Sequence, residues 1–226
     1  MAVQVDVTDA TGMHEWLETL DEKHPIDMVV ANAGVSEATI GAQNDPVKAA
    51  KVLLPINITG VMNSVLPLIE PMKTRGHGTI VLMASLASFG PITNSAAYSA
   101  SKVAVRIWGE ALRTELARDG VDVCVVCPGF VSSPMTAVNK FYMPGLIDMD
   151  ACIAYIREGL LYNAPVTAFP PSTYTLAQMA GSLPTVVRDA LARWRALPGL
   201  YFYRRKSSKG ARAASTAAAG AAAKKK

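Results

Sequence analysis

The stretch VDVCVVCPGF, residues 121–130, is the part of the sequence that decides the fold. Its first six residues hold four valines and a cysteine beside one charged residue, and a proline and a glycine end the apolar run. A short run of β-branched residues with a turn signal behind it predicts a strand. Because the run is almost continuously apolar, we expect a parallel sheet with both faces covered.

Similar apolar runs recur along the chain and alternate with helical patterns. Strands are expected at 3–7, 26–30, 79–83 and 121–126, and helices at 12–22, 46–75, 96–118 and 149–162. This alternation predicts parallel strands with right-handed crossovers, a three-layer α/β sandwich. We expect Pro55, Pro67 and Pro71 to kink or split the second helix, because proline removes an amide donor.

The C-terminal third has a looser pattern. VTAFPPS, residues 166–172, predicts a last short strand. The next helix is expected to carry one apolar stripe, made of Val186, Val187, Ala190, Leu191, Trp194 and Leu197.

The charge balance divides the chain into a body and a tail. The formal net charge is +4, but residues 204–226 contain eight Lys or Arg and no Asp or Glu. Residues 1–203 therefore carry 14 basic and 18 acidic side chains, a net charge of −4. A nucleic-acid groove needs clustered positive charge, so no nucleic acid is expected to bind this body. We expect one domain over 1–203 and a basic, Ala-rich, disordered tail over 204–226.

The cysteines and the N-terminus bear on the compartment. Cys124 and Cys127 have C-x-x-C spacing, but residues three apart in a strand point to opposite faces. We expect them to be inert, buried thiols in a reducing compartment, and we predict no metal site. MAVQVDVTD has no basic segment before an apolar stretch, and no apolar run is expected to reach the ~20 residues of a membrane span. A cytoplasmic protein is expected.

Polar residues with chemical potential follow the predicted strands. In open parallel sheets, ligands bind beyond the carboxyl ends of the strands. These positions hold Asp6 at the end of the first strand, Asn32, Ala33 and Gly34 after the second, Ser85 after the third, and Pro128 and Gly129 after the fourth. Asn57 lies inside the proline-containing helix, and Tyr98 begins the helix after Ser85.

Tyr98 and Lys102 are four residues apart on one predicted helix, so their side chains share a face. A phenol with a pKa near ~10 is a poor acid or base at neutral pH. A unit charge ~4 Å away at an effective dielectric of ~20 contributes about 4 kcal/mol, or roughly three pKa units. We therefore expect Lys102 to lower the pKa of Tyr98 toward neutrality.

Six sequence elements together resemble the short-chain dehydrogenase/reductase family. They are DVTD (6–9), ANAG (31–34), NITG (57–60), Ser85 thirteen residues before Tyr98, YSASK (98–102) and CPGFVSSPM (127–135). A tyrosine and lysine four apart are common by chance, whereas six elements in order are specific. The resemblance implies a Rossmann-like, doubly wound fold and hydride transfer between NAD or NADP and a secondary alcohol or ketone, with an apolar substrate.

The resemblance also implies a role for each matching residue. Tyr98 would be the general acid or base, and Ser85 would bond the substrate oxygen. Lys102 would also hold the nicotinamide ribose, and Asn57 would fix a water that relays protons. The remaining cofactor contacts would be Asp6 at the adenine, Asn32, Ala33 and Gly34 at the cofactor floor, Pro128, Gly129 and Val131 at the nicotinamide, and Ser133 at the carboxamide or pyrophosphate.

Simpler interpretations stay open for several of these residues. Tyr98 and Lys102 alone would suit a surface pair, and Asn57 would satisfy backbone groups freed by Pro55. Asp6 would serve as a cap or turn residue before the next helix, and Gly34 would serve a tight turn. None of the three histidines is expected to be catalytic.

The family's glycine-rich turn, T-G-x-x-x-G-x-G, has no counterpart in this sequence. In TGMHEWLE, residues 11–18, Trp16 and Glu18 stand where glycines are needed to let a phosphate approach. The resemblance implies that the chain begins at the family's third strand. The strands expected at 3–7 and 26–30 would then stand ~14 Å apart unless they close up and pair; otherwise, their edges stay open. The residue that selects NAD or NADP would also be missing.

A rival hypothesis is a catalytically silent homologue that acts by association. The open sheet edge, the helix with Trp194 and LYFYRRK, residues 200–206, would supply apolar and basic surface for a protein or an anionic membrane. For the enzyme, the family habit implies a homo-oligomer formed through the helices at 46–75 and 96–118.

Overall fold

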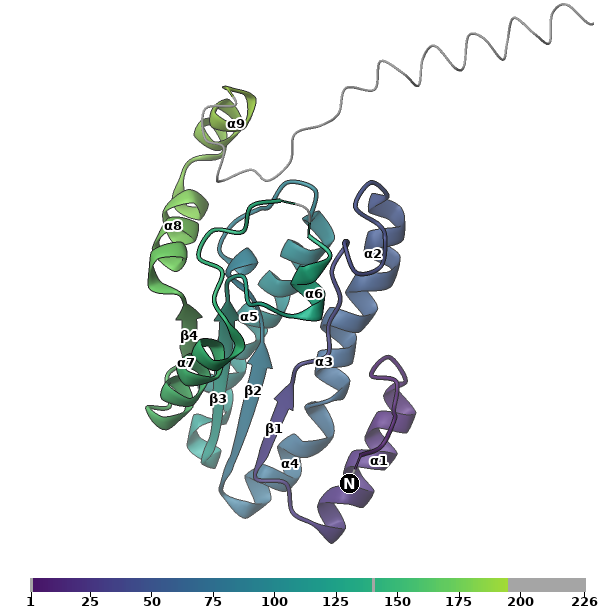
Figure 1. Ribbon diagram of the computed structural model, residues 1–226. Coiled ribbons are helices and arrows are strands. Elements are labelled where there is room, and N and C mark those ends of the chain that lie inside the picture. Colours follow the sequence, from purple (N-terminus) through teal and green to yellow (C-terminus); the bar gives the residue numbers. More distant parts are fainter. Residues whose placement is uncertain (1, 140, 195–226) are drawn as a thin grey trace, which may run out of the picture.

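Four parallel strands form one sheet in the computed structural model, which describes residues 2–139 and 141–194 (Figure 1). The strands lie in the order β1 (Met28–Ala31), β2 (Gly78–Met83), β3 (Val121–Pro128) and β4 (Val166–Phe169). Ala31 is paired with Leu82, and Val125 with both Leu82 and Val166. The predicted α/β class is therefore confirmed.

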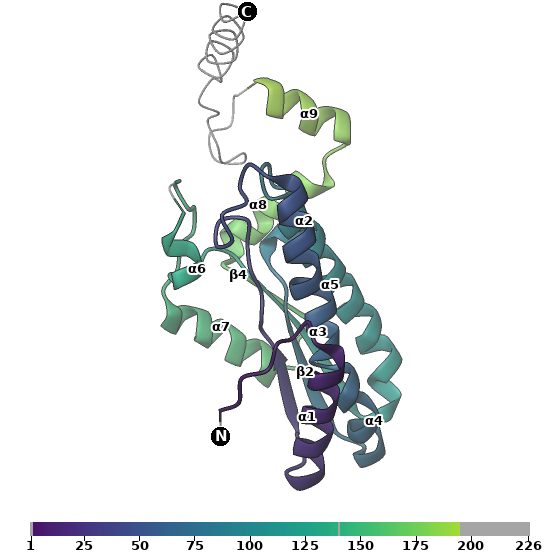
Figure 2. The ribbon, with the colours of Figure 1, turned by 90° about the vertical axis from the view of Figure 1, so that its right-hand side faces the viewer.

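Helices connect the strands and position their ends. They are α1 (Ala10–Lys23), α2 (Pro46–Leu54), the π-helix η1 (Pro55–Thr59), α3 (Gly60–Asn63), α4 (Leu66–Arg75), η2 (Leu86–Ser88), α5 (Ala96–Leu116), η3 (Ala117–Asp119), α6 (Pro134–Ala137), α7 (Met149–Leu161), α8 (Pro171–Ser182) and α9 (Thr185–Trp194). Figure 2 shows α8 and α9 at the end of the molecule opposite to α4.

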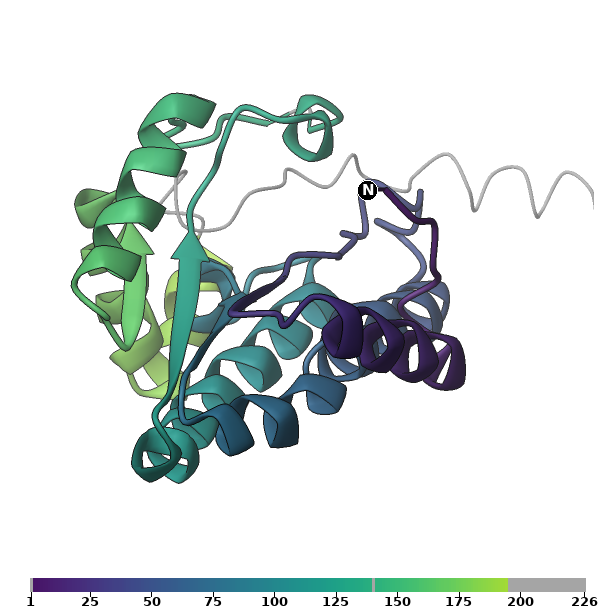
Figure 3. The ribbon, with the colours of Figure 1, turned by 90° about the horizontal axis from the view of Figure 1, so that it is seen from below.

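The two faces of the sheet are covered by different helices. Figure 3 shows α1, α4 and α5 on one side of the strands and α7 on the other. Val123, Val125 and Cys127 pack with the first group in the main core, whereas Val126 packs with Cys152 of α7. Side chains on the two faces of β3 thus pack into two different cores, as its continuous apolar run predicts. All three cysteines are buried and free.

The segment 3–7 is not a strand, contrary to the sequence prediction. It lies against α3 instead: Asn63 Nδ2 donates to Val7 O at 2.9 Å, and a Cβ atom at Gly60 would contact the Val7 side chain. Val5 and Val7 pack against the main core without joining the sheet. The edge of β1 therefore stays open within the described residues, and Met28 and Val30 are 48% and 50% exposed.

Prolines divide the long helical segment 46–75, as predicted. Its central turn widens at Pro55, whose carbonyl accepts from the amide of Gly60 five residues later. Contrary to the expectation that no apolar run reaches the length of a membrane span, Pro46–Arg75 is long and apolar enough to cross a membrane by length and composition. Its apolar face is buried inside the protein, with Leu53, Val61, Val65, Leu68 and Met72 at most 1% exposed, as in a core helix.

The predicted stripe of the last helix is only partly described. Val186 and Val187 are 80% and 42% exposed, so these members of the stripe do not pack into the described core. The tail 204–226, Leu197 and the cluster 200–206 lie outside the described residues.

Candidate active site

Asn57 is held in the interior by the π-helical turn and is 0% exposed. Its Oδ1 accepts from Val35 N at 2.8 Å, and its Nδ2 donates to Val35 O at 2.9 Å and to Ser101 Oγ at 3.1 Å. Ser101 Oγ in turn donates to Tyr98 O at 2.7 Å. These bonds do not satisfy groups freed by Pro55. Asn57 instead ties the loop after β1 to α5.

Replacing Asn57 with Ala should lower the free energy of unfolding by about 2 to 3 kcal/mol, because both backbone groups of Val35 lose a buried partner. Urea denaturation measures the change. Asn63→Ala is the matched control: Asn63 is half-buried on the same helical segment and makes one bond, to Val7 O, so a loss of about 1 kcal/mol is expected. Equal losses in the two variants would contradict the inference that Asn57 ties the loop after β1 to α5.

Lys102 is a buried cation on the inner face of α5, 4% exposed. Its Nζ donates to Met83 O, the last residue of β2, at 2.7 Å, and lies 5.7 Å from the centroid of the Tyr98 ring. Burial lowers the pKa of Lys102 to about 8, since desolvation disfavours the charged ammonium, and the Cys127 thiol opposes this only in part. The pair is therefore internal, and the interpretation as a surface pair fails.

The pKa of Tyr98 is raised, opposite to the expected lowering. Burial is the main cause, the hydrogen bond with Ser85 lowers the pKa, and the charges of Glu37 and Cys127 raise it further. Lys102 does not reverse this, because its Nζ is bonded to Met83 O and its distance to the ring exceeds the ~4 Å assumed from helical spacing. In this state Tyr98 is a proton donor.

Ser85 caps the short helix η2 and lies between β2 and β3. Its Oγ accepts a hydrogen bond from Ala87 N at 3.1 Å and donates one to Pro128 O at 3.4 Å. Pro128 ends β3, and Gly129 N donates to Phe169 O at 2.7 Å. A Cβ atom at Gly129 would lie 3.2 Å from Leu86 and 3.3 Å from Phe169 O, so a glycine suits this close approach.

Gly34 lies beside the buried polar groups. A Cβ atom there would be 3.4 Å from Asn57 Oδ1 and 3.6 Å from Lys102 Nζ. Its backbone is not left-handed, so a turn conformation is not the reason for a glycine. The preceding residues Asn32 and Ala33 are exposed. A Cβ atom at Gly34 would therefore make ordinary van der Waals contact with Asn57 and Lys102.

The other predicted cofactor residues lie at the margins of this cluster. Asp6 is exposed in a turn, where its Oδ1 accepts from both the amide and the hydroxyl of Thr8 at 2.9 Å. These bonds lower the pKa of Asp6. Ser133 caps α6 together with Thr136, and Val131 bridges to Ile147. The structure thus gives Asp6 a turn role, and contact with adenine stays a prediction.

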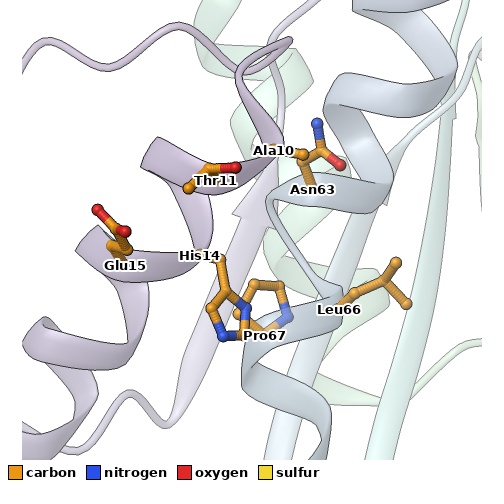
Figure 4. Close-up of a pocket in the computed structure, with 7 residues that line it drawn as sticks. All are labelled: Ala10, Thr11, His14, Glu15, Asn63, Leu66 and Pro67. Atoms are coloured by element: carbon orange, nitrogen blue, oxygen red, sulfur yellow. The ribbon is translucent and has the colours of Figure 1, made fainter.

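Two surface grooves in the described part of the chain are lined by none of these residues. One, about 390 Å³, lies between α1 and the α3–α4 segment (Figure 4) and is lined by Ala10, Thr11, His14, Glu15, Asn63, Leu66 and Pro67. The other, about 430 Å³, lies between the 88–92 segment and the outer face of α5. Neither contains the Tyr98 cluster.

Sequence reasoning missed Glu37, a 4% exposed residue whose Oε1 accepts from Tyr98 N at 3.0 Å. It lies between the ANAG motif and the next helix, in a loop without periodic pattern, and nothing in the sequence singles out this acid. Only the three-dimensional contact between residues 61 positions apart identifies it.

Comparison with known proteins identifies the family of this chain. A family model described as short chain dehydrogenase matches residues 1–141. The chain belongs to the short-chain dehydrogenase family. An uncharacterized oxidoreductase of Myxococcus xanthus is 35% identical over 192 residues, which cover 84% of this chain and 76% of the relative. The ketoacyl reductase HetN of Nostoc is 32% identical, with 86% and 71% covered.

Solved short-chain dehydrogenases have the same fold. One from Burkholderia cenocepacia in complex with NADP has a TM-score of 0.70 at 23% identity, with 87% of this chain and 81% of the other covered. A gluconate 5-dehydrogenase from the same species, in complex with NADP and tartrate, has a TM-score of 0.53 at 25% identity. That match covers 58% of this chain and 52% of the dehydrogenase, and matches to other relatives span as little as 36% of their length.

Proposed function

We propose that this short-chain dehydrogenase homologue interconverts a secondary alcohol and a ketone by hydride transfer with NAD or NADP. The observation that carries the proposal is that Tyr98 lies beside the buried Lys102 and Asn57, and that the Ser85 hydroxyl lowers the pKa of Tyr98. The relative named a ketoacyl reductase and the structures that contain NADP support this reaction class.

The residues present fit one half of the cofactor. Lys102 Nζ is a buried ammonium with three donors, and its one short bond goes to Met83 O. The space beside Gly34, which a Cβ atom would fill, lies next to that ammonium. Lys102, Tyr98 and the Asn32–Gly34 loop would hold the nicotinamide ribose, with Gly129 and Val131 beside the ring. The described residues include no glycine-rich turn, so we assign none to the pyrophosphate.

The side chains supply the proton chemistry. When bound, the cofactor supplies or accepts the hydride. In ketone reduction, Tyr98 donates its phenolic proton to the substrate oxygen while Ser85 Oγ donates a hydrogen bond that stabilises the growing negative charge. The Lys102 ammonium, four residues further along the same helix, carries exchangeable protons and is the source from which Tyr98 is reprotonated. Asn57 holds Val35 and Ser101, and through them α5 and the loop after β1.

An apolar substrate is favoured by the segment between β3 and α7. Its exposed apolar side chains are Val138, Tyr142 and Leu146, which are 46%, 78% and 47% exposed. Such side chains beside the carboxyl end of β3 suit an apolar alcohol or ketone. We also propose a homo-oligomer, since Val103 and Ile107 of α5 are 38% and 49% exposed. Three free, buried cysteines fit a cytoplasmic location.

A second candidate function, association without catalysis, is favoured by the open edge of β1. Met28 and Val30 expose half of their surface on a strand with an unpaired edge within the described residues, and such an edge accepts another strand. Deleting residues 184–226 tests the membrane form of this candidate: unchanged co-sedimentation with anionic vesicles would exclude that segment as the anchor.

Titration of the 226-residue chain with NADH and with NADPH, followed by nicotinamide fluorescence, tests the first proposal. Saturable binding at micromolar concentrations is expected for one or both. Circular dichroism controls for folding. A folded chain that binds neither nucleotide would overturn the oxidoreductase proposal for this chain and favour association.

A further inference from the structure

Glu37 lies in the loop between β1 and α2 and contacts the start of α5. Its side chain is buried, and its Oε1 accepts a hydrogen bond of 3.0 Å from the amide of Tyr98. The neighbouring apolar cluster consists of Val35, Ile40, Ala42, Ala49, Leu53, Ala97 and Tyr98. A carboxylate is costly to bury without a partner, so its single strong contact is informative.

The start of α5 lacks a local cap. Ser95 occupies the N-cap position but makes no side-chain cap bond, and Tyr98 is the third residue of the helix. An N-cap side chain usually accepts from the second or third helical amide. Glu37 takes this place from a distant part of the chain. A negative charge there also interacts favourably with the positive end of the helix dipole.

Two contacts hold the loop after β1 in register with the Tyr98 cluster. Val35 is bonded through its amide and carbonyl to Asn57, and Glu37 O accepts from Ala42 N at 2.8 Å, which closes the loop on itself. With its backbone fixed on both sides, Glu37 presents its carboxylate to α5. The loop thereby links the space beside Gly34 to the backbone of Tyr98 itself.

Charged and titratable groups reach Tyr98 from each element packed around it. Glu37 comes from the loop after β1, Lys102 from α5, and Cys127 from β3, while Ser85 contributes a neutral hydroxyl. Glu37 is the residue among these whose side chain also bonds the Tyr98 backbone. It therefore affects the tyrosine by position and by charge at once.

We propose that Glu37 is a positioning residue for Tyr98: its buried carboxylate caps the start of α5 at the Tyr98 amide and places a negative charge beside the tyrosine. The role in catalysis rests on the proposed function, because it requires Tyr98 to be the proton donor. The effect on the phenol does not require it. Since like charges disfavour each other, a carboxylate bonded to the Tyr98 amide opposes formation of the phenolate, in the same direction as burial. The cluster is thereby biased toward the acid form that ketone reduction uses.

The test is an NMR titration of the full chain labelled at tyrosine ¹³Cζ, with Tyr98→Phe used to assign the Tyr98 signal. In Glu37→Gln, the Tyr98 signal should begin its alkaline transition about one pH unit earlier than in the unmodified chain, because the amide keeps an acceptor but loses the charge. Asp45→Asn is the matched control. Asp45 caps α2 in the same loop through Lys48 N at 2.9 Å, and its neutralisation should leave Tyr98 unchanged.

Equal transitions in Glu37→Gln and the unmodified chain would overturn the proposal, as would an equal shift in Asp45→Asn. If Glu37→Gln does not fold, Glu37→Asp gives the answer. Its shorter side chain keeps the charge but withdraws the carboxylate from the Tyr98 amide, so the amide signal should move and the ¹³Cζ transition should begin earlier. No change in either signal would overturn the proposal. The titration needs neither cofactor nor substrate, so an inactive enzyme would not affect its result.

Discussion

Replacing Tyr98 with Phe should reduce turnover by about two to four orders of magnitude, the usual contribution of a general acid or base. Phenylalanine keeps the ring that packs against Ala97 and Leu53 and removes only the hydroxyl. The Ser85 hydroxyl keeps its contacts to Ala87 N and Pro128 O, so the fold and nicotinamide binding should be retained. Single-turnover oxidation of the nicotinamide measures the chemical step separately from binding.

Tyr162→Phe is the matched control for this substitution. Tyr162 is 74% exposed at the end of α7, and its hydroxyl has no place in the proposed chemistry. Turnover of this variant should equal that of the unmodified chain. A Tyr98→Phe enzyme that retains turnover within a factor of two would assign the proton transfer to another group.

Patterns repeated over many residues predicted most of the fold. The continuous apolar run of β3 indicated burial on both faces, and the prolines of 46–75 indicated a divided helix; both features are present. The segment 3–7 shows the limit of such reasoning. Its alternation is that of a strand, but a strand also needs a backbone partner, and Asn63 binds the carbonyl of Val7 instead.

The candidate site was predictable as a set of residues and not as a set of contacts. The sequence placed Tyr98, Lys102, Ser85 and Asn57 near one sheet edge, because strand ends and helical spacing fix where side chains start. Their bonds depend on elements far apart in the chain: Lys102 to Met83, Asn57 to Val35, and Glu37 to Tyr98. The pKa of Tyr98 is raised because of that packing: burial outweighs the charge of Lys102, whose Nζ is already bonded to Met83 O.

Replacing Lys102 with Met should abolish turnover and stabilise the fold. Burial lowers the pKa of Lys102 from its ordinary 10.5 to about 8, which corresponds to about 3 kcal/mol against folding at neutral pH at ~1.36 kcal/mol per pKa unit. Losing the bond to Met83 O costs about 1 kcal/mol, so a net gain of about 2 kcal/mol is expected. Lys48→Met, at an exposed lysine of α2, should change stability by less than about 0.5 kcal/mol.

The stability gained in Lys102→Met should depend on pH. Below pH 8 the Lys102 ammonium is protonated in both the folded and unfolded chains, so the full cost of burying the charge is present. Between pH 8 and 10.5 the unfolded chain holds more protons, and the unmodified protein gains stability as the pH rises. The advantage of Lys102→Met in urea denaturation should therefore be largest at pH 7 and shrink as the pH approaches 10. An advantage that stays constant, or a less stable variant at pH 7, would show that the buried ammonium is held by contacts stronger than its single bond to Met83. In the expected case, the lysine is kept at a cost to stability for the sake of the chemistry at Tyr98.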